Sequence, residues 1–131
     1  TVVKVPGWKR NLHCICVHLS LHERGRRRQL AAIAARLEEL ADKRLPIIVA
    51  GDFNDWRQRA SSILEKSLGM TEVSVAAGGR PGRTYPSVLP LFHLDRIYVR
   101  GFKVLRSRVH RGPPWSLLSD HLAVSAELER A

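Results

Sequence analysis

Three short segments of the chain each place an acidic side chain where an extended run begins or ends. The segment "GDFN" (residues 51–54) follows an aliphatic run, "HLDR" (93–96) opens a later run, and "LSDH" (118–121) opens the last one. Gly, Asn and Asp are common turn residues, so a single acid of this kind is explained by a turn after a buried strand. Three of them in one chain instead indicate a rim that several strands share.

Asp52 and Asn54 have the chemistry of a site for a hard cation. They lie two residues apart in an extended segment, so a carboxylate and an amide face the same way and can address one ligand. Such oxygen ligands suit Mg²⁺ or Mn²⁺. Together with His121, the set resembles the equipment for phosphoryl hydrolysis: a metal that neutralises charge, a carboxylate that orients water, and an imidazole that steadies the transition state.

The elements that must hold these side chains can be predicted from hydrophobic periodicity. Residues 11–19 alternate two largely apolar faces and predict a strand covered on both sides, and residues 46–53 predict a second buried strand. Between them, apolar residues three and four apart from Leu30 to Ala41 predict an amphipathic helix that ends near Lys43 and Arg44. Residues 60–69 predict a short helix with a glycine stop.

The second half of the chain reads mostly as strands. Residues 70–75 predict a strand and residues 76–90 a long Gly- and Pro-rich loop. Residues 93–101 and 102–110 predict two strands paired around Gly101, and residues 121–129 a closing strand. This order predicts an α/β fold whose mixed sheet carries its helices on one face. The other face of such a sheet needs cover, so we expect the chain to seek a partner layer.

The composition is that of one soluble globular domain. The 131 residues are 44% hydrophobic and 26% charged, and no uncharged apolar run approaches the roughly 18 to 20 residues that span a bilayer. With no apolar leader-like segment at the start, we expect a cytoplasmic protein. The formal charge of +10 favours anionic partners such as nucleic acid, phosphorylated metabolites or anionic lipid. A first residue other than Met is expected for a piece of a longer protein, although a processed or engineered end would look the same.

Several of these residues carry rival interpretations. Cys14, Cys16 and His18 share one strand face and could ligate Zn²⁺, although their spacing lacks the C-x-x-C or H-x-x-x-H pattern of structural sites. His18 could also be an ordinary hydrogen-bonded residue of an apolar strand. Asp95 could simply pair with a nearby arginine. The run "RGRRR" (24–28) could contact substrate phosphates or form the solvated start of a helix.

Four motifs, in order and with the rough spacing, resemble the endonuclease/exonuclease/phosphatase superfamily, also called the DNase I-like family. They are "HL" (18–19), "GDFN" (51–54), "LDRIYV" (94–99) and "SDHLAV" (119–124). The resemblance runs from about Asn11 to the end. "GDFNDW" with "ERGRRRQL" looks most like a bacterial branch related to a protein encoded beside a cardiolipin synthase.

The resemblance implies a divalent-metal-dependent phosphoric ester hydrolase, that is, a phosphodiesterase, nuclease or phosphatase with Mg²⁺ or Mn²⁺ as cofactor. Nucleic acid, phospholipid and inositol phosphate all stay open as the phosphate-ester substrate. Asp52 would orient or deprotonate the attacking water, and Asn54 would hold the scissile phosphate. Asp52, Asn54 and Asp120 would also hold or position the metal.

The remaining site residues implied by the resemblance surround the phosphate. His121 would hydrogen-bond the phosphate as charge builds on it, and Asp95 would orient His121 through its other ring nitrogen. His18 would contact the phosphate or assist the leaving group. At loop positions, Arg83 and Tyr85 would border the cleft. Arg83 and Trp115 would bind substrate, Trp115 as a stacking or lid residue, unless Trp115 is a loop anchor.

The chain departs from the family pattern in its length. The family domain is about twice as long, because two similar halves each give a sheet to a four-layer α/β sandwich, and its principal metal ligand, a Glu, lies in the N-terminal half. Residues 1–131 are therefore expected to be the C-terminal half, weakly active or inactive alone. We expect the open sheet face to pair with an N-terminal half or to form a homo-oligomer. The alternative is a non-catalytic basic module that binds nucleic acid or anionic lipid.

Overall fold

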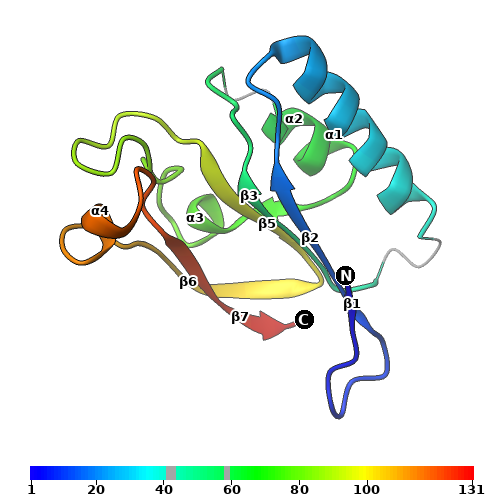
Figure 1. Cartoon of the computed structure of the whole chain (residues 1–131). Coiled ribbons are helices and arrows are strands. Elements are labelled where there is room, and N and C mark those ends of the chain that lie inside the picture. The colour runs from blue at the N-terminus through cyan, green and yellow to red at the C-terminus, as the bar shows by residue number, and fades with distance from the viewer. Residues whose placement is uncertain (41–43, 58–59) are drawn as a thin grey trace.

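A mixed five-stranded sheet forms the centre of the fold in the computed structural model, which describes residues 1–40, 44–57 and 60–131 (Figure 1). Its strands are β1 (Val2–Val3), β2 (Leu12–His18), β3 (Ile47–Asp52), β4 (Thr71–Glu72) and β5 (Asp95–Arg100). They lie in the order β1-β2-β3-β5-β4, and only β2 and β3 are parallel. A second, antiparallel ladder joins β6 (Phe102–Val109) to β7 (Val124–Arg130). The fold is thus the expected α/β class with a mixed sheet.

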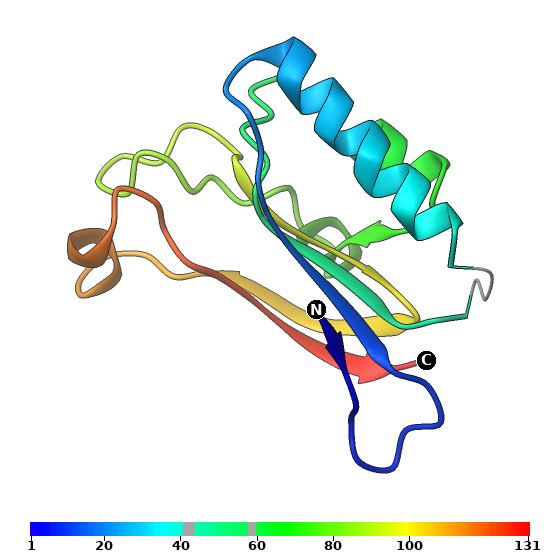
Figure 2. The ribbon, with the colours of Figure 1, turned by 45° about the vertical axis from the view of Figure 1, so that its right-hand side comes forward.

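Two longer helices pack on one face of the five-stranded sheet. They are α1 (Glu23–Glu38) and α2 (Ala60–Lys66), and the β6–β7 ladder lies on the side of the sheet away from α1 (Figure 2). Two further helices are single turns, α3 (Val73–Ala76) and α4 (Trp115–Leu118). Within the described residues, none of the helices has the length and apolar character needed to cross a membrane.

The core lies between the sheet and these two helices. Alternation along β2 directs Val17 toward α1, where it joins Leu30 and Leu37 in one buried cluster with Ile47 and Val49 of β3. Burying an aliphatic side chain of this size contributes roughly 1.5 to 3 kcal/mol. The cluster therefore fixes β2 and β3 from the helix side and sets where their last residues emerge.

The opposite face of β2 is open, which corrects the expectation of a strand covered on both sides. Cys16 and His18 are exposed there and Cys14 is half-buried, and both thiols are free. The alternation itself follows the sequence prediction, because Cys14, Cys16 and His18 lie on the same face of β2. Only one of the two faces is covered by this chain.

The ends of α1 differ from the predicted ones. The helix begins at Glu23, before the apolar pattern starts, because the buried Arg26 guanidinium donates to the carbonyl oxygens of Ser20 and Leu21 and so anchors the polar first turn. It ends at Glu38 rather than near Arg44, and Lys43 lies outside the described residues.

The pairing of the later strands also differs from the prediction. Residues 70–75 form only the short β4, because the Glu72 side chain accepts a hydrogen bond from the Val75 N–H (2.8 Å) and starts α3. The predicted hairpin around Gly101 is wrong. Both edges of β5 are occupied, by β3 and by β4, so Gly101 (φ +80°) turns the chain away and β6 pairs with β7 instead.

Candidate active site

Three polar side chains lie in one row at the ends of three neighbouring strands, β2, β3 and β5. His18 is the last residue of β2 and pairs in register with Asp52, the last residue of β3. Asp52 in turn pairs with Asp95, the first residue of β5. Paired residues of neighbouring strands direct their side chains to the same face, so the three groups meet on one face at the ends of these strands. The Asp52 carboxylate (Oδ2) lies 3.7 Å from the His18 imidazole (Nε2).

Gly51 allows β2 and β3 to approach closely beside this row. Its φ is +138°, a conformation that side chains disfavour, and a Cβ at this position would lie 2.0 Å from the Val17 carbonyl oxygen. The glycine of the "GDFN" motif is therefore needed by the backbone directly before the acid.

Asn54 fixes the orientation of Asp52. Its backbone N–H donates to the Asp52 carboxylate (Oδ1, 2.7 Å), and its side-chain amide donates to the Leu19 carbonyl (2.7 Å). Asn54 is buried and has φ +46°, which asparagine tolerates better than most residues. The turn interpretation and the catalytic interpretation of this motif are thus compatible, because the turn is what holds the two polar groups in place.

A second chain of hydrogen bonds holds His121. Its Nδ1 lies 2.7 Å from the Asp95 carboxylate (Oδ2), and the fully buried Thr84 donates its hydroxyl to the same oxygen (2.6 Å). The Thr84 oxygen also accepts the Asp95 backbone N–H (3.2 Å). A charged carboxylate only accepts hydrogen bonds, so Nδ1 carries the hydrogen and Nε2 is left to address another group.

Two groups of the site have shifted proton affinities. Burial raises the pKa of Asp52, and the Asp95 charge adds to this, while the Asn54 N–H and the His121 and His18 charges oppose it. For His121, burial works against the charged form, but the hydrogen bond to Asp95 and the charges of Asp95, Asp52 and Asp120 outweigh it and raise the pKa. The site therefore favours a protonated imidazole near a carboxylate that is a stronger base than usual.

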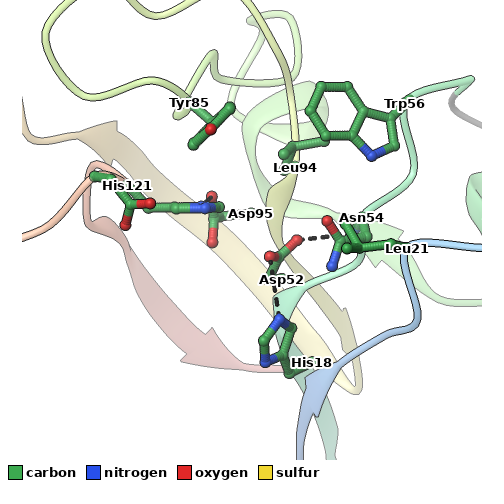
Figure 3. A pocket seen from close by; sticks show the side chains of 10 residues that line it. His18, Leu21, Asp52, Asn54, Trp56, Tyr85, Leu94, Asp95 and His121 are labelled. Carbon is green, nitrogen blue, oxygen red and sulfur yellow. Dashed lines mark hydrogen bonds and ion pairs between the residues drawn. The ribbon is translucent and has the colours of Figure 1, made fainter.

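One open pocket brings these groups together (Figure 3). Its lining includes all the residues expected for catalysis and metal binding, namely His18, Asp52, Asn54, Asp95, Asp120 and His121. Arg83 and Trp115 do not line it. Arg83 is exposed, and Trp115 packs its ring on His110 at 4.7 Å.

Four apolar or aromatic side chains complete the lining, Leu21, Trp56, Tyr85 and Leu94. The Tyr85 ring lies 4.8 Å from the His121 ring, and the Trp56 ring lies 4.6 Å from that of Phe92. The cleft position expected for Tyr85 agrees with the structure. The sequence does not predict the hydrogen bond of Thr84 to Asp95, because Thr84 lies in an irregular loop. It also gives no role to Trp56, although Trp56 stands in the "GDFNDW" segment.

The oxygen groups in the pocket suit a hard cation but provide only part of its ligands. Asp52, Asn54 and Asp120 supply carboxylate and amide oxygens, and Mg²⁺ keeps several waters when it is bound by few side chains. Among residues 1–40, 44–57 and 60–131, no group of three His, Cys, Asp or Glu is placed to hold a metal ion. That statement also covers Cys14, Cys16 and His18, the set considered for zinc.

Comparison with known proteins identifies relatives over nearly the whole chain. It is 45% identical over 123 residues to YbhP of Escherichia coli K12, described as uncharacterized, in a match that covers 94% of this chain and 48% of YbhP. The chain thus spans about half the length of these curated relatives.

Solved structures share the fold. A functionally unknown conserved protein from Enterococcus faecalis V583 matches with a TM-score of 0.74 and 26% identity, over 98% of this chain and 54% of that one. The mannosyl-6-phosphatase Bt3783 of Bacteroides thetaiotaomicron matches with a TM-score of 0.68 and 19% identity, over 95% of this chain and 52% of that one. A model of the endonuclease/exonuclease/phosphatase family matches residues 2–121. The chain belongs to the endonuclease/exonuclease/phosphatase family.

Proposed function

We propose that this chain supplies the water-activating and phosphate-binding side of a divalent-metal-dependent phosphoric ester hydrolase. The observation that carries the proposal is that the Thr84–Asp95–His121 hydrogen-bond chain ends in the same pocket as Asp52 and Asn54. Family membership supports hydrolysis of a phosphate ester, the chemistry named for the mannosyl-6-phosphatase of the same fold.

In this proposal the pocket residues divide the work of an in-line attack by water. Asp52 accepts the proton of the attacking water, and burial makes its carboxylate a stronger base. Asn54 binds a phosphate oxygen through its remaining amide hydrogen. His121 donates from Nε2 to the phosphate as negative charge builds, while Asp95 keeps the ring oriented. His18, across the Asp52 carboxylate, contacts the phosphate or assists the leaving group.

Asp52, Asn54 and Asp120 would hold Mg²⁺ or Mn²⁺, which when bound supplies positive charge to the phosphate oxygens. The oxygen atoms of these residues are the type of ligand that such an ion prefers, but they are fewer than a complete coordination shell needs. We therefore propose that residues 1–131 are a C-terminal half and that a further ligand comes from an N-terminal half. Pairing would use the open sheet face, either with that half or with a second copy of the chain, which sedimentation would distinguish.

The experiment compares this chain with the longer natural chain. Hydrolysis of bis(p-nitrophenyl) phosphate and of p-nitrophenyl phosphate is measured with Mg²⁺, with Mn²⁺ and with EDTA. Asp52→Asn and His121→Ala should each lower turnover of the longer chain on the order of a hundredfold or more, since each removes a group acting in the transition state. A longer chain that hydrolyses neither substrate, or variants that match the wild type, would refute the proposal.

The second candidate is a basic module that binds polyanions without chemistry. It is favoured by the formal charge of +10 and by the lack, among the described residues, of a full set of metal-ligating groups. The same assay distinguishes the two candidates, because a binding module would hydrolyse neither substrate, even as the longer chain. A cytoplasmic location and kinship with the branch encoded beside a cardiolipin synthase stay as proposals, which fractionation of cells and the surrounding gene order would test.

A further inference from the structure

Large aliphatic and aromatic side chains are exposed on segments that carry or adjoin the residues lining the active-site pocket. They lie on the turn before α1, the loop after β3, the loop of residues 86–92, and α4. Figures 1 and 2 both place the loop of residues 86–92 and α4 on the same side of the molecule. We define the apolar rim as six of these exposed residues, Leu21, Trp56, Val88, Leu89, Leu117 and Leu118.

Hydrogen bonds join the rim to the site. The buried Ser87 donates its N–H to the Asp120 carbonyl (2.7 Å) and its hydroxyl to the Ser116 carbonyl (3.2 Å). These two bonds tie the loop that carries Val88 and Leu89 to α4 and to the Asp120 segment. Leu21 and Trp56 themselves line the pocket. The rim is therefore part of the same framework that presents the pocket.

The exposure of the rim is unusually high for aliphatic side chains. Val88 is 80% exposed, Leu89 65%, Leu117 77% and Leu118 73%. Removing such a side chain from water is favourable, so this exposure has a cost for the free chain. Exposed apolar residues on the segments around a pocket indicate an interaction surface, covered by a partner molecule or a membrane.

Positively charged side chains near the rim indicate which kind of partner covers it. Arg24, Arg27 and Arg28 are exposed on the first turns of α1, directly after Leu21, and Arg83 and Arg111 are exposed on the segments that lead to the 86–92 loop and α4. The one acid of the first turn, Glu23, pairs with Arg57 (3.5 Å), and Glu38 lies at the far end of the helix. Apolar side chains bordered by arginines are the combination that binds an anionic lipid surface.

Nucleic acid fits this surface less well. Phosphates would pair with the arginines and bases could stack on Trp56, but the four most exposed rim residues are aliphatic and offer neither charge nor a stacking face. A folded protein seated on the rim would cover the mouth of the pocket. A bilayer covers the same residues while presenting phosphate esters to the pocket.

We propose that the apolar rim docks on an anionic lipid bilayer and places the pocket against the headgroup phosphate esters. Docking is independent of catalysis, whereas the identification of the substrate class as phospholipid rests on the proposed function. Leu117, Leu118, Val88 and Leu89 insert among the acyl chains, and the arginines of α1 contact the anionic headgroups.

The test measures binding of this chain to vesicles by flotation. Vesicles of phosphatidylcholine alone are compared with vesicles containing about 30% phosphatidylglycerol, a composition that gives the surface negative charge. The chain should float with the anionic vesicles only. The double variants Val88→Ser/Leu89→Ser and Leu117→Ser/Leu118→Ser should each weaken binding on the order of tenfold or more. The matched control, Val75→Ser/Leu105→Ser, removes two exposed apolar side chains away from the rim and should bind as the wild type does.

Three results would overturn docking: no flotation with anionic vesicles, rim variants that float as well as the wild type, or rim variants that change the oligomeric state in sedimentation while vesicle binding stays. Weaker binding of the rim variants to single-stranded DNA, with no vesicle binding by the wild type, would assign the rim to nucleic acid instead. Circular dichroism checks that each variant is folded. Failure of the proposed function has a different signature, since vesicle binding would persist while the longer chain hydrolyses no phosphate ester.

Discussion

Asp95 has two tasks in the proposed site, to hold the His121 ring and to favour its charged form, and Asp95→Asn separates them. The amide oxygen of the new side chain can still accept the hydrogen bonds from His121 Nδ1 and Thr84. The negative charge beside the ring is lost. The variant should therefore keep the geometry of the ring and lower the pKa of His121.

The size of this effect follows from the contact. A hydrogen bond to a charged group contributes about 1.5 to 3 kcal/mol, against about 0.5 to 1.5 kcal/mol for a neutral one. The two side chains are 25% and 21% exposed, so solvent screens the difference in part, and about 1.4 kcal/mol is a reasonable expectation. At a pH where both forms are populated, the ratio of imidazolium to imidazole should thus fall about tenfold.

Nuclear magnetic resonance of the histidine ring protons measures that ratio directly as the pH is varied between about 5 and 9. The chain has six histidines, and His121→Gln identifies the signal of interest. Asp120→Asn is the matched control, because it removes an equal charge that acts on His121 more weakly and without a hydrogen bond to it. An unchanged His121 titration in a folded Asp95→Asn variant, or an equal change in both variants, would refute the role given to Asp95.

Three further predictions concern stability, measured by urea unfolding in EDTA. His121 has a raised pKa in the folded chain, so its charged form stabilises the fold below the ordinary imidazole pKa, and the difference between wild type and His121→Gln should shrink as the pH rises through the folded pKa. The pKa of Asp52 is also raised, so its negative charge opposes folding. Asp52→Asn should therefore have a higher free energy of unfolding than the wild type at neutral pH. At acid pH, where the carboxyl is already neutral, the variant should show no such increase. Gly51→Ala should cost about 3 kcal/mol or more, because its Cβ would meet the Val17 carbonyl, whereas Gly7→Ala, also at positive φ but with nothing within 4 Å, should cost about 1 kcal/mol. Equal losses for the two alanines, or a destabilised Asp52→Asn, would contradict the reasoning.

The fold was predictable where local pattern decides and not where strand partners compete. Strands over 11–19 and 46–53 and the helix over 60–69 agree with β2, β3 and α2, since their apolar periods and glycine stops are local signals. The hairpin around Gly101 failed because nothing local shows that β4 takes the free edge of β5. Pairing is decided by residues far apart in the chain, which a single sequence does not reveal.

The site shows the same division. Asp52, Asn54, Asp95, Asp120 and His121 could be predicted because their motifs are contiguous and lie at the ends of strands. The positioning contact of Thr84 could not be predicted, since Thr84 reaches Asp95 from a loop without regular structure. The packing of Trp56 on Tyr85 is likewise a tertiary contact that the sequence does not show. Motifs thus indicate which polar groups the fold gathers in the pocket, while the groups that orient them become visible only in three dimensions.

The hydrogen bonds within residues 1–131 bear on what an N-terminal half would add. Hydrogen bonds from Asn54 hold the Asp52 carboxylate and the Leu19 carbonyl. Asp95, itself held by Thr84, binds the His121 ring. All of these contacts lie within this chain. In the proposed longer enzyme, an added half would contribute a metal ligand and cover for the open sheet face rather than order in this part of the site. It follows that the titration of His121 should be nearly the same in this chain and in the longer one in EDTA, although the proposal predicts different hydrolytic activities for the two. A His121 that titrates normally in this chain and becomes shifted only in the longer one would show instead that the second half organises the site.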